Sequence, residues 1–193
     1  MELTGHEDLR IQRTISAIQE SFASMLSEMD YHRITVAELC RRARINKKTF
    51  YRYYETIDAL LAEFQKRMIN DYLPHIADYK FPQDIDKMIR TFFTYNAQQD
   101  RAFEQVTCMA NHQFIREYVI REIMDSVWSR DPSQENKDAF RYQVLYAFWN
   151  NTVLTIYRQW IESGKTTPLE EVIELAIELT CSGLNGALEN RKA

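Results

Sequence analysis

Apolar residues recur along most of the chain at spacings of three and four positions, the period of one face of an α-helix. The strict alternation of apolar and polar residues that predicts a half-buried strand is absent from the sequence. Glycine and proline number only four each, so few positions interrupt the helical period. The pattern therefore predicts an all-α fold of about nine helices.

The N-terminal part of the chain predicts three helices around one core. The first is expected over residues 9–29. A second begins after Thr35 and a third after Asn46, since both side chains accept hydrogen bonds well at an N-cap. On the third helix Phe50 and Tyr54 lie four positions apart and should point into the core. The second and third helices, with the short turn between them, predict a helix-turn-helix.

The rest of the chain predicts six further helices. The fourth should begin after Thr56 and stop near Leu73, because Pro74 disfavours helix in the residue before it. The fifth helix should start at Pro82 and the sixth at Asp100, and the seventh should end just before Asp131. The eighth should run from Ser133 to Gly164. The ninth should start at Thr167 and Pro168 and end near Gly183 or Gly186.

Charge is distributed unevenly along the sequence, whose net charge is −4. Residues 31–54 contain seven basic residues against one acidic residue, whereas residues 1–30 contain two basic and six acidic residues. Attraction to phosphate is local, so one compact basic segment in an acidic chain indicates contact with nucleic acid. On charge alone, a solvated basic face explains this segment equally well.

The expected third helix explains where the basic residues stand. With Phe50 and Tyr54 inward, Lys47, Lys48, Thr49, Arg52 and Tyr53 are left on its outer faces. A short helix of this kind enters the major groove with its N-terminal residues nearest the base edges. Lys and Arg pair well with guanine. The backbone N–H groups at the start of the second helix, together with Thr35, are placed to receive a phosphate.

Residues 34–39, 43–54 and 58–61 resemble the signature of the TetR family of regulators, and the resemblance covers roughly residues 10–70. In that family a threonine opens the second helix, an Ala-Gly-Val turn follows, and the recognition helix ends in a Tyr-x-x-Phe pattern. The resemblance implies phosphate contacts for Thr35, Tyr51 and Tyr53, and base or groove contacts for Lys47, Lys48 and Thr49. Arg44 and Arg52 complete the set of expected DNA-binding residues.

Three positions depart from the family pattern. Arg44 stands where the family usually has glycine, which predicts a strained or differently twisted turn. Lys48 replaces a small residue, which alters the choice of operator. Ile57 stands where a phosphate-binding lysine is frequent, so we do not carry that contact over.

The family resemblance also divides the chain. Residues 1–56, with the start of the fourth helix to about residue 70, are expected to form the DNA-binding domain, and residues 57–193 a regulatory and dimerisation domain. Residues 148–149, 160–165 and 168–171 resemble, more loosely, TetR regulators of the dihydroxyacetone kinase type. In the family the last two long helices pair with those of a second subunit. This implies a homodimer on a palindromic, double-stranded operator.

The aromatic and polar residues of the fourth to eighth helices allow two interpretations. They line a pocket for an unknown small-molecule effector, or they form core and dimer interface. These residues are Met68, Tyr72, Phe92, Tyr95, Asn96, Met109, His112, Tyr146, Trp149 and Asn150. The first interpretation predicts a repressor that is released from DNA by its effector. The alternative is a co-regulator with the same fold that is controlled by a protein partner.

Other classes of protein fit the sequence less well. The four histidines are scattered, and no metalloprotease, serine-hydrolase or glycine-rich phosphate motif is found, so no enzyme is expected. The three cysteines, Cys40, Cys108 and Cys181, are too widely spaced for a CxxC metal pair, so neither a metal nor a cofactor is expected. No apolar run is long enough to cross a bilayer. A cytoplasmic protein without a membrane partner is therefore expected.

Overall fold

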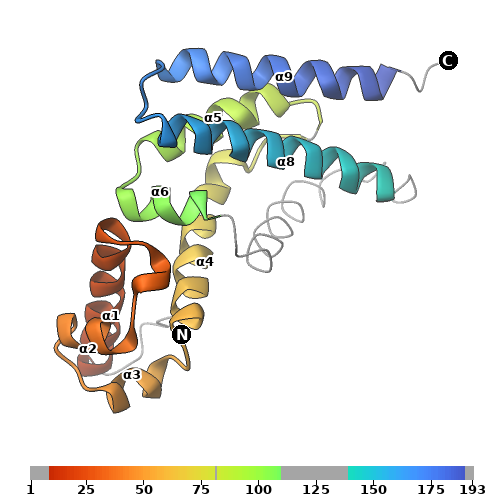
Figure 1. Cartoon of the computed structure of the whole chain (residues 1–193). Coiled ribbons are helices and arrows are strands. Elements are labelled where there is room, and N and C mark those ends of the chain that lie inside the picture. Colours follow the sequence, from red (N-terminus) through yellow and green to blue (C-terminus); the bar gives the residue numbers. More distant parts are fainter. Residues whose placement is uncertain (1–8, 81, 110–138, 190–193) are drawn as a thin grey trace. The chain divides into compact units, whose positions relative to one another are not determined.

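The structure, a computed structural model, describes residues 9–80, 82–109 and 139–189. These residues form eight α-helices and one short 3₁₀ turn, with no strand among them (Figure 1). The predicted all-α fold is confirmed. The seventh helix expected from the sequence, with its end before Asp131, and the expected cap Ser133 lie outside the described residues.

The helices pack into two compact units. The first lies within Met1–Asp71 and Asp100–Val119, the second within Tyr72–Gln99 and Ile120–Ala193. The elements that carry residues of the first unit are α1 (Leu9–Glu28), the 3₁₀ turn (Tyr31–Arg33), α2 (Val36–Arg42), α3 (Lys47–Tyr53), α4 (Ile57–Ile76) and α6 (Arg101–Cys108).

The core of the first unit forms from the apolar stripes that the sequence predicts. Phe22 of α1, Leu39 of α2, Phe50 of α3 and Leu61 of α4 are all fully buried. Phe22 also meets Phe64 edge-on, with ring centroids 6.2 Å apart. Since four helices contribute to one cluster, α2 and α3 are held in place by tertiary packing as well as by their own short turn.

The fourth helix continues past its predicted end. It runs through Pro74 to Ile76, whereas the sequence predicted a stop near Leu73. Proline removes one backbone hydrogen bond and disfavours the helical conformation of the residue before it. Burial of Ile76, which is fully enclosed, offsets this cost over the last half turn.

The second unit contains α5 (Ile85–Ala97), α8 (Ala139–Glu162) and α9 (Leu169–Glu189). The helix α9 packs against both α5 and α8, and Figure 1 shows α8 and α9 side by side. Tyr157 of α8 is fully buried and meets the rings of Phe92 and Phe93 edge-on, at centroid distances of 5.4 and 5.8 Å. An aromatic cluster therefore forms the core of this unit.

Helix limits that depend on neighbouring elements differ from the predicted ones. Pro82 lies in a turn, and α5 begins three residues later, at Ile85. Asp84, the residue before it, accepts hydrogen bonds from the Lys80 N–H and from the Lys87 side chain. The last helix, α9, passes Gly183 and Gly186 and ends at Glu189. A Cβ on Gly183 would lie 3.1 Å from the ring of Phe148, so this glycine makes room for α8 instead of ending α9.

Limits that depend on local chemistry agree with the sequence. Asp100 caps α6, accepting a hydrogen bond of 2.9 Å from the Phe103 N–H. The helix α8 ends at Glu162, two residues before the expected Gly164, which adopts a φ of 74° just after the helix. The first helical residue of α9 is Leu169, one position after the expected Pro168, whose carbonyl accepts the first helical hydrogen bond.

The two packing units do not coincide with the functional division expected at residue 56. The helix α6 packs with α1 in the first unit, and α4 carries residues of both units. The expected division describes roles, not packing, and stays a prediction. Of the helices that the structure describes, none combines the length and the apolar character needed to cross a membrane.

Candidate nucleic-acid interface

The helix α3, which the sequence predicts to be the recognition helix, is fixed at both ends. At its start Asn46 Oδ1 accepts hydrogen bonds from the Thr49 N–H at 2.8 Å and from the Thr49 hydroxyl at 3.0 Å. At its end the Tyr54 N–H donates to Phe50 O at 3.0 Å, and the side chains of both residues are buried. The predicted cap and the predicted inward pair are thus confirmed. They determine which face of α3 meets solvent.

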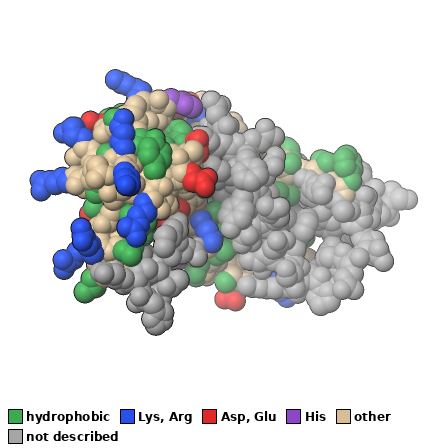
Figure 2. Space-filling model, turned by 90° about the horizontal axis from the view of Figure 1, so that it is seen from below, with side chains coloured by type: hydrophobic (Ala, Val, Ile, Leu, Met, Phe, Trp, Pro, Cys, Tyr) green, Lys and Arg blue, Asp and Glu red, His purple; other side chains and the backbone are tan. Residues whose placement is uncertain are grey.

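Cationic side chains occupy the solvent face of α3. Lys47 and Lys48 in its first turn are exposed, and so is Arg52 near its end. Tyr51 is 54% exposed, an unusual position for a large ring. Figure 2, which views the molecule from this side, shows Lys and Arg side chains gathered with few Asp or Glu side chains among them.

Tyr53 lies differently from the position expected on an outer face. It is half-buried and packs against the core cluster, while the Arg52 guanidinium stands 5.8 Å from its ring centroid. Thr49 is also half-buried, and its hydroxyl hydrogen is engaged by Asn46. In this arrangement the Thr49 oxygen can accept a hydrogen bond but has no hydrogen to donate.

The turn between α2 and α3 is a Schellman motif with an arginine at the position that usually holds glycine. The Ile45 N–H donates to Cys40 O at 3.0 Å, and the Arg44 N–H donates to Arg41 O at 3.3 Å. Arg44 has a φ of 54°, in the left-handed region. The strain predicted from the sequence is therefore present in the backbone, while the exposed Arg44 side chain extends the cationic face.

Two arginines of α2 contribute less free charge than the sequence suggests. Glu38 accepts hydrogen bonds from Arg41 at 2.6 and 2.8 Å and from Arg42 at 3.0 Å. These bonds, the stronger from Arg41, lower the pKa of Glu38 to about 2. Arg42 also pairs with Glu28 of α1 at 2.7 Å. The face available to an anion is therefore centred on α3 and the turn, not on α2.

The start of α2 is a polar end that faces solvent. Thr35 is exposed, and its hydroxyl oxygen accepts a hydrogen bond of 3.2 Å from the Glu38 N–H. The N–H groups of the first helical turn have no partner inside the helix, which makes a helix start a favourable place for a phosphate. The predicted cap is confirmed, and its role toward DNA stays a prediction.

A polar network joins α3 to the helices behind it. The Gln19 amide of α1 donates to the Tyr54 hydroxyl at 3.2 Å and to Glu63 of α4 at 2.8 Å. The Tyr54 hydroxyl donates to the same Glu63 oxygen at 3.3 Å, and Arg67 donates to Gln19 at 3.0 Å. The Tyr31 hydroxyl likewise donates to Asp58. Burial, followed by this hydrogen bond, raises the pKa of Tyr31. The orientation of α3 thus depends on α1 and α4.

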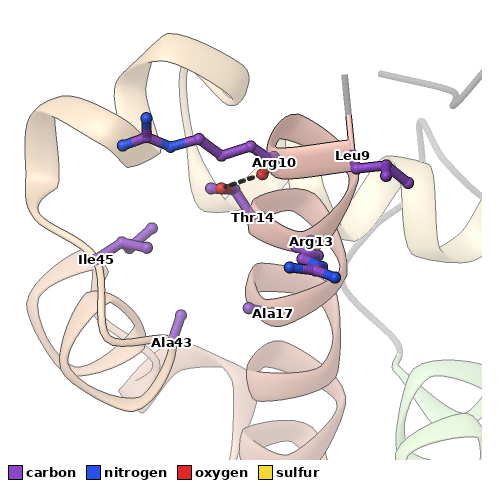
Figure 3. A pocket seen from close by; sticks show the side chains of 7 residues that line it. All are labelled: Leu9, Arg10, Arg13, Thr14, Ala17, Ala43 and Ile45. Carbon is purple, nitrogen blue, oxygen red and sulfur yellow. Dashed lines mark hydrogen bonds between the residues drawn. The ribbon is translucent and has the colours of Figure 1, made fainter. Parts of the chain in front are cut away.

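A groove beside the turn was not anticipated from the sequence. We call it the α1–turn groove; it has a volume of about 470 Å³ and opens between α1 and the turn (Figure 3). Arg10 and Arg13 are its cationic residues, and their spacing of three on α1 is the one sequence signal that could have drawn attention to them. The lining residues are Leu9, Arg10, Arg13, Thr14, Ala17, Ala43 and Ile45.

The residues expected to line an effector pocket fall into two groups. Met68 and Met109 pack against the core of the first unit, and His112 lies outside the described residues. The others belong to the second unit, where the Tyr72 and Tyr95 rings stand 5.3 Å apart, and those of Tyr146 and Trp149 stand at the same distance. Asn96 is buried, and its amide donates to Phe92 O at 2.7 Å. Asn150 is half-buried.

Comparison with known proteins agrees with this architecture. Residues 23–64 match the family described as bacterial regulatory proteins, tetR family. An uncharacterized HTH-type transcriptional regulator of Bacillus subtilis, YxbF, is 24% identical over 174 residues, which are 84% of this chain and 43% of that protein. The chain thus spans less than half the length of this curated relative.

Solved structures share the fold. A TetR transcriptional regulator from Streptococcus agalactiae is 19% identical and superposes with a TM-score of 0.67, covering 89% of this chain and 95% of its own. FadR from Bacillus subtilis, solved in complex with stearoyl-CoA, is 17% identical with a TM-score of 0.65 and coverages of 88% and 98%. The dihydroxyacetone kinase operon activator DhaS is 17% identical with a TM-score of 0.50, covering 89% and 96%.

These similarities agree with each other and with the geometry. The family match runs from the end of α1 through the 3₁₀ turn, α2 and α3 to the first part of α4. The relative and the three solved structures are all named as regulators or as an operon activator, and DhaS is of the type expected from the C-terminal residues. Residues 23–64 thus match the tetR-family model of bacterial regulatory proteins, and the chain shares its fold with a solved TetR regulator.

Proposed function

We propose that this protein is a sequence-specific, DNA-binding transcription regulator whose helix α3 reads the operator. The observation that carries the proposal is the exposed cationic first turn of α3, with Lys47 and Lys48 on a helix whose opposite side is fixed in a core. A short helix held in this way presents its start to base edges in the major groove. Two lysines there supply the hydrogen-bond donors that guanine O6 and N7 accept.

Contacts with the DNA backbone complete the interface. Thr35 at the start of α2 and the exposed hydroxyl of Tyr51 are suited to phosphate, as are the side chains of Arg44 and Arg52. Tyr53, half-buried, has less of its ring in reach of DNA than Tyr51. We therefore assign Tyr51 the larger share of the contact that the family resemblance implies for both tyrosines.

Paired substitutions separate base contacts from phosphate contacts. Lys48→Ala should change the preferred base at one operator position by about 1–3 kcal/mol, if Lys48 makes a good base contact. Tyr51→Phe should weaken binding to every duplex by one common factor, since phosphate contacts carry no sequence information. Selection from a random-sequence duplex library with each variant measures both. Unchanged preference and affinity in both variants would falsify the assignment of α3.

A two-fold dimer through α8 and α9 accounts for apolar residues left on the surface. Phe140, Val144 and Phe148 recur every four positions on α8, and Phe140 is 76% exposed. Leu175 and Leu179 form the same pattern on α9. An exposed apolar stripe on two adjacent helices is typical of a protein interface. Such a dimer places two recognition helices on a palindromic operator.

We further propose that a small molecule bound in the second unit releases the protein from DNA. The FadR structure contains stearoyl-CoA, which supports a bound effector in a protein of this fold. The helix α4 begins next to α3, shares the Tyr54–Glu63 contact with it, and ends with residues of the second unit. A tilt of α4 would therefore move α3, and a ligand that favours the tilted state lowers operator affinity.

The effector proposal is tested with stearoyl-CoA as the first probe. Its addition should lower the affinity for the selected duplex, and Tyr72→Ala should change this response while ligand-free binding stays as in the parent. A reporter gene behind the selected duplex distinguishes repression from activation, which matters because DhaS is named as an activator. If acyl-CoA esters and a metabolite library leave binding unchanged, control by a protein partner becomes the better proposal.

A further inference from the structure

The α1–turn groove lies directly beside the start of the recognition helix. Its turn side is formed by Ala43 and Ile45, which flank Arg44, and the next residue is Asn46, the N-cap of α3. Its other side is the first part of α1. Figure 3 shows the side chains of Ala43 and Ile45 on one side of the opening and those of Arg10, Arg13 and Thr14 on the other.

The chemistry of the groove favours an anion. Among the residues that the structure describes, no carboxylate lines the groove, and Ala17, Ala43 and Ile45 make its inner surface apolar. The Thr14 hydroxyl donates to Arg10 O at 2.8 Å, so its hydrogen is engaged within the helix. The guanidinium groups of Arg10 and Arg13 also line the groove. Guanidinium is the side-chain group best matched to phosphate oxygens.

We propose that this groove binds backbone phosphates of the operator, beside the stretch that α3 enters, with Arg10 and Arg13 as their ligands. The inference rests on the proposed function, since α3 must bring DNA to this side of the unit. The major groove is about 12 Å wide, so a helix inside it has a phosphate strand on either side. The groove is one residue from the cap of α3 and stays within reach of one of these strands.

The expected signature is a change in salt dependence without a change in sequence preference. Each phosphate contact contributes about 0.9 to the slope of log affinity against log salt concentration. Arg13→Gln should lower this slope by about that amount for each subunit that binds. It should also weaken selected and scrambled duplexes by the same factor. Arg10→Gln should act in the same direction, and Arg13→Lys should retain most of the slope because it keeps the charge.

The experiment measures binding of the 193-residue chain to the duplex that the parent selects from a random library, between about 50 and 200 mM salt. Lys80→Gln is the matched control, because it removes one exposed positive charge from the second unit. Thermal melting of each variant confirms that its fold is intact. A slope that falls for Arg13→Gln and Arg10→Gln, and not for Lys80→Gln, supports the proposal.

Three other results would overturn it, each for a different reason. If both arginine variants have the same salt slope as Lys80→Gln, α3 remains the DNA contact and the groove is not part of the interface. Saturable binding of inorganic phosphate that Arg13→Gln abolishes, with unchanged duplex slopes, assigns the groove to a free anion. Failure of the parent to bind any duplex more tightly than a scrambled one overturns the proposed function together with this inference.

Discussion

Arg44 adopts a backbone conformation that costs a residue with a Cβ about 1–2 kcal/mol. After the end of α8, in a second Schellman motif, the left-handed position is held instead by a glycine, Gly164, with a φ of 74°. Residues in strained conformations occur most often where a side chain serves a function. The exposed position of Arg44, between two residues that line the α1–turn groove, fits a contact with DNA that outweighs the local strain.

The first prediction exchanges the residue types at the two left-handed positions, Arg44 and Gly164. Arg44→Gly should raise the free energy of unfolding by about 0.5–1 kcal/mol, because release of strain exceeds the added entropy of the unfolded chain. The same variant should bind duplex DNA less tightly. Gly164→Ala should lower the free energy of unfolding by about 1 kcal/mol through its φ alone, since an added Cβ there meets nothing within 4 Å. Urea unfolding measures both, and a less stable Arg44→Gly would contradict the argument.

The second prediction concerns acid stability. The hydrogen bonds from Arg41 and then Arg42 lower the pKa of Glu38 from 4.5 to about 2. A carboxyl group with a lowered folded-state pKa contributes stability above its unfolded pKa and loses that contribution as the pH falls toward the folded value. Glu38→Gln should therefore reduce the loss of melting temperature between pH 4.5 and pH 2. Equal losses in parent and variant would show that the ion pairs are open in solution.

At the scale of elements, the start and end of α3 are set by local contacts, whereas its orientation depends on neighbouring helices. Its cap and turn involve contacts within a few residues, but its tilt depends on the network of Gln19, Tyr54, Glu63 and Arg67, which joins α1, α3 and α4. Burial raises the pKa of Tyr54, so its hydroxyl keeps its hydrogen across the physiological range. The network therefore holds α3 without a change of charge.

The third prediction separates positioning from contact on the same helix. Tyr54→Phe should lower the free energy of unfolding by about 1 kcal/mol, because it removes the hydroxyl that bridges Gln19 and Glu63. Tyr51→Phe, the matched control, should leave stability unchanged, since Tyr51 is 54% exposed, and should weaken DNA binding instead. The outcome that counts against this division is an equal effect of both variants on stability.

The elements also show how far sequence reasoning reaches. Thr35, Asn46 and Asp100 were predictable caps because each side chain accepts a hydrogen bond from the backbone N–H three residues further on. The helix ends predicted at Pro74 and near Gly183 were wrong, because burial of Ile76 and close approach of Phe148 are tertiary effects. The α1–turn groove was out of reach for the same reason, since its two sides are separated by some thirty positions of the chain.

At the scale of the whole molecule, one recognition helix is too little for an operator. A short helix touches few base pairs, and each correct pair contributes only about 1–3 kcal/mol. Two half-sites read by a symmetric dimer multiply this discrimination. The stripes of Phe140, Val144 and Phe148 on α8 and of Leu175 and Leu179 on α9 adjoin, because Phe148 packs over Gly183 in the next turn of α9. They form a continuous apolar surface, on which we place the second subunit of the proposed dimer.

The fourth prediction tests this surface and its consequence for DNA. Val144→Glu with Leu179→Glu should reduce the mass measured by solution scattering from twice 23.0 kDa to a single chain, because burying two carboxylates in an apolar interface is strongly unfavourable. Both positions are about half exposed in the single chain, so its own fold should persist. Leu9→Glu changes an exposed leucine of the first unit in the same way and should leave the mass at the dimer value.

The monomeric variant should keep weak, salt-sensitive binding to any duplex, since each chain retains its cationic face. It should lose its preference for a palindrome over a single half-site, because that preference comes from simultaneous contact by two linked subunits. Binding to duplexes that carry one or two half-sites measures this ratio directly. A double variant that remains a dimer places the interface elsewhere on the chain. A monomer that still prefers the palindrome means that two chains assemble on DNA through contacts outside α8 and α9.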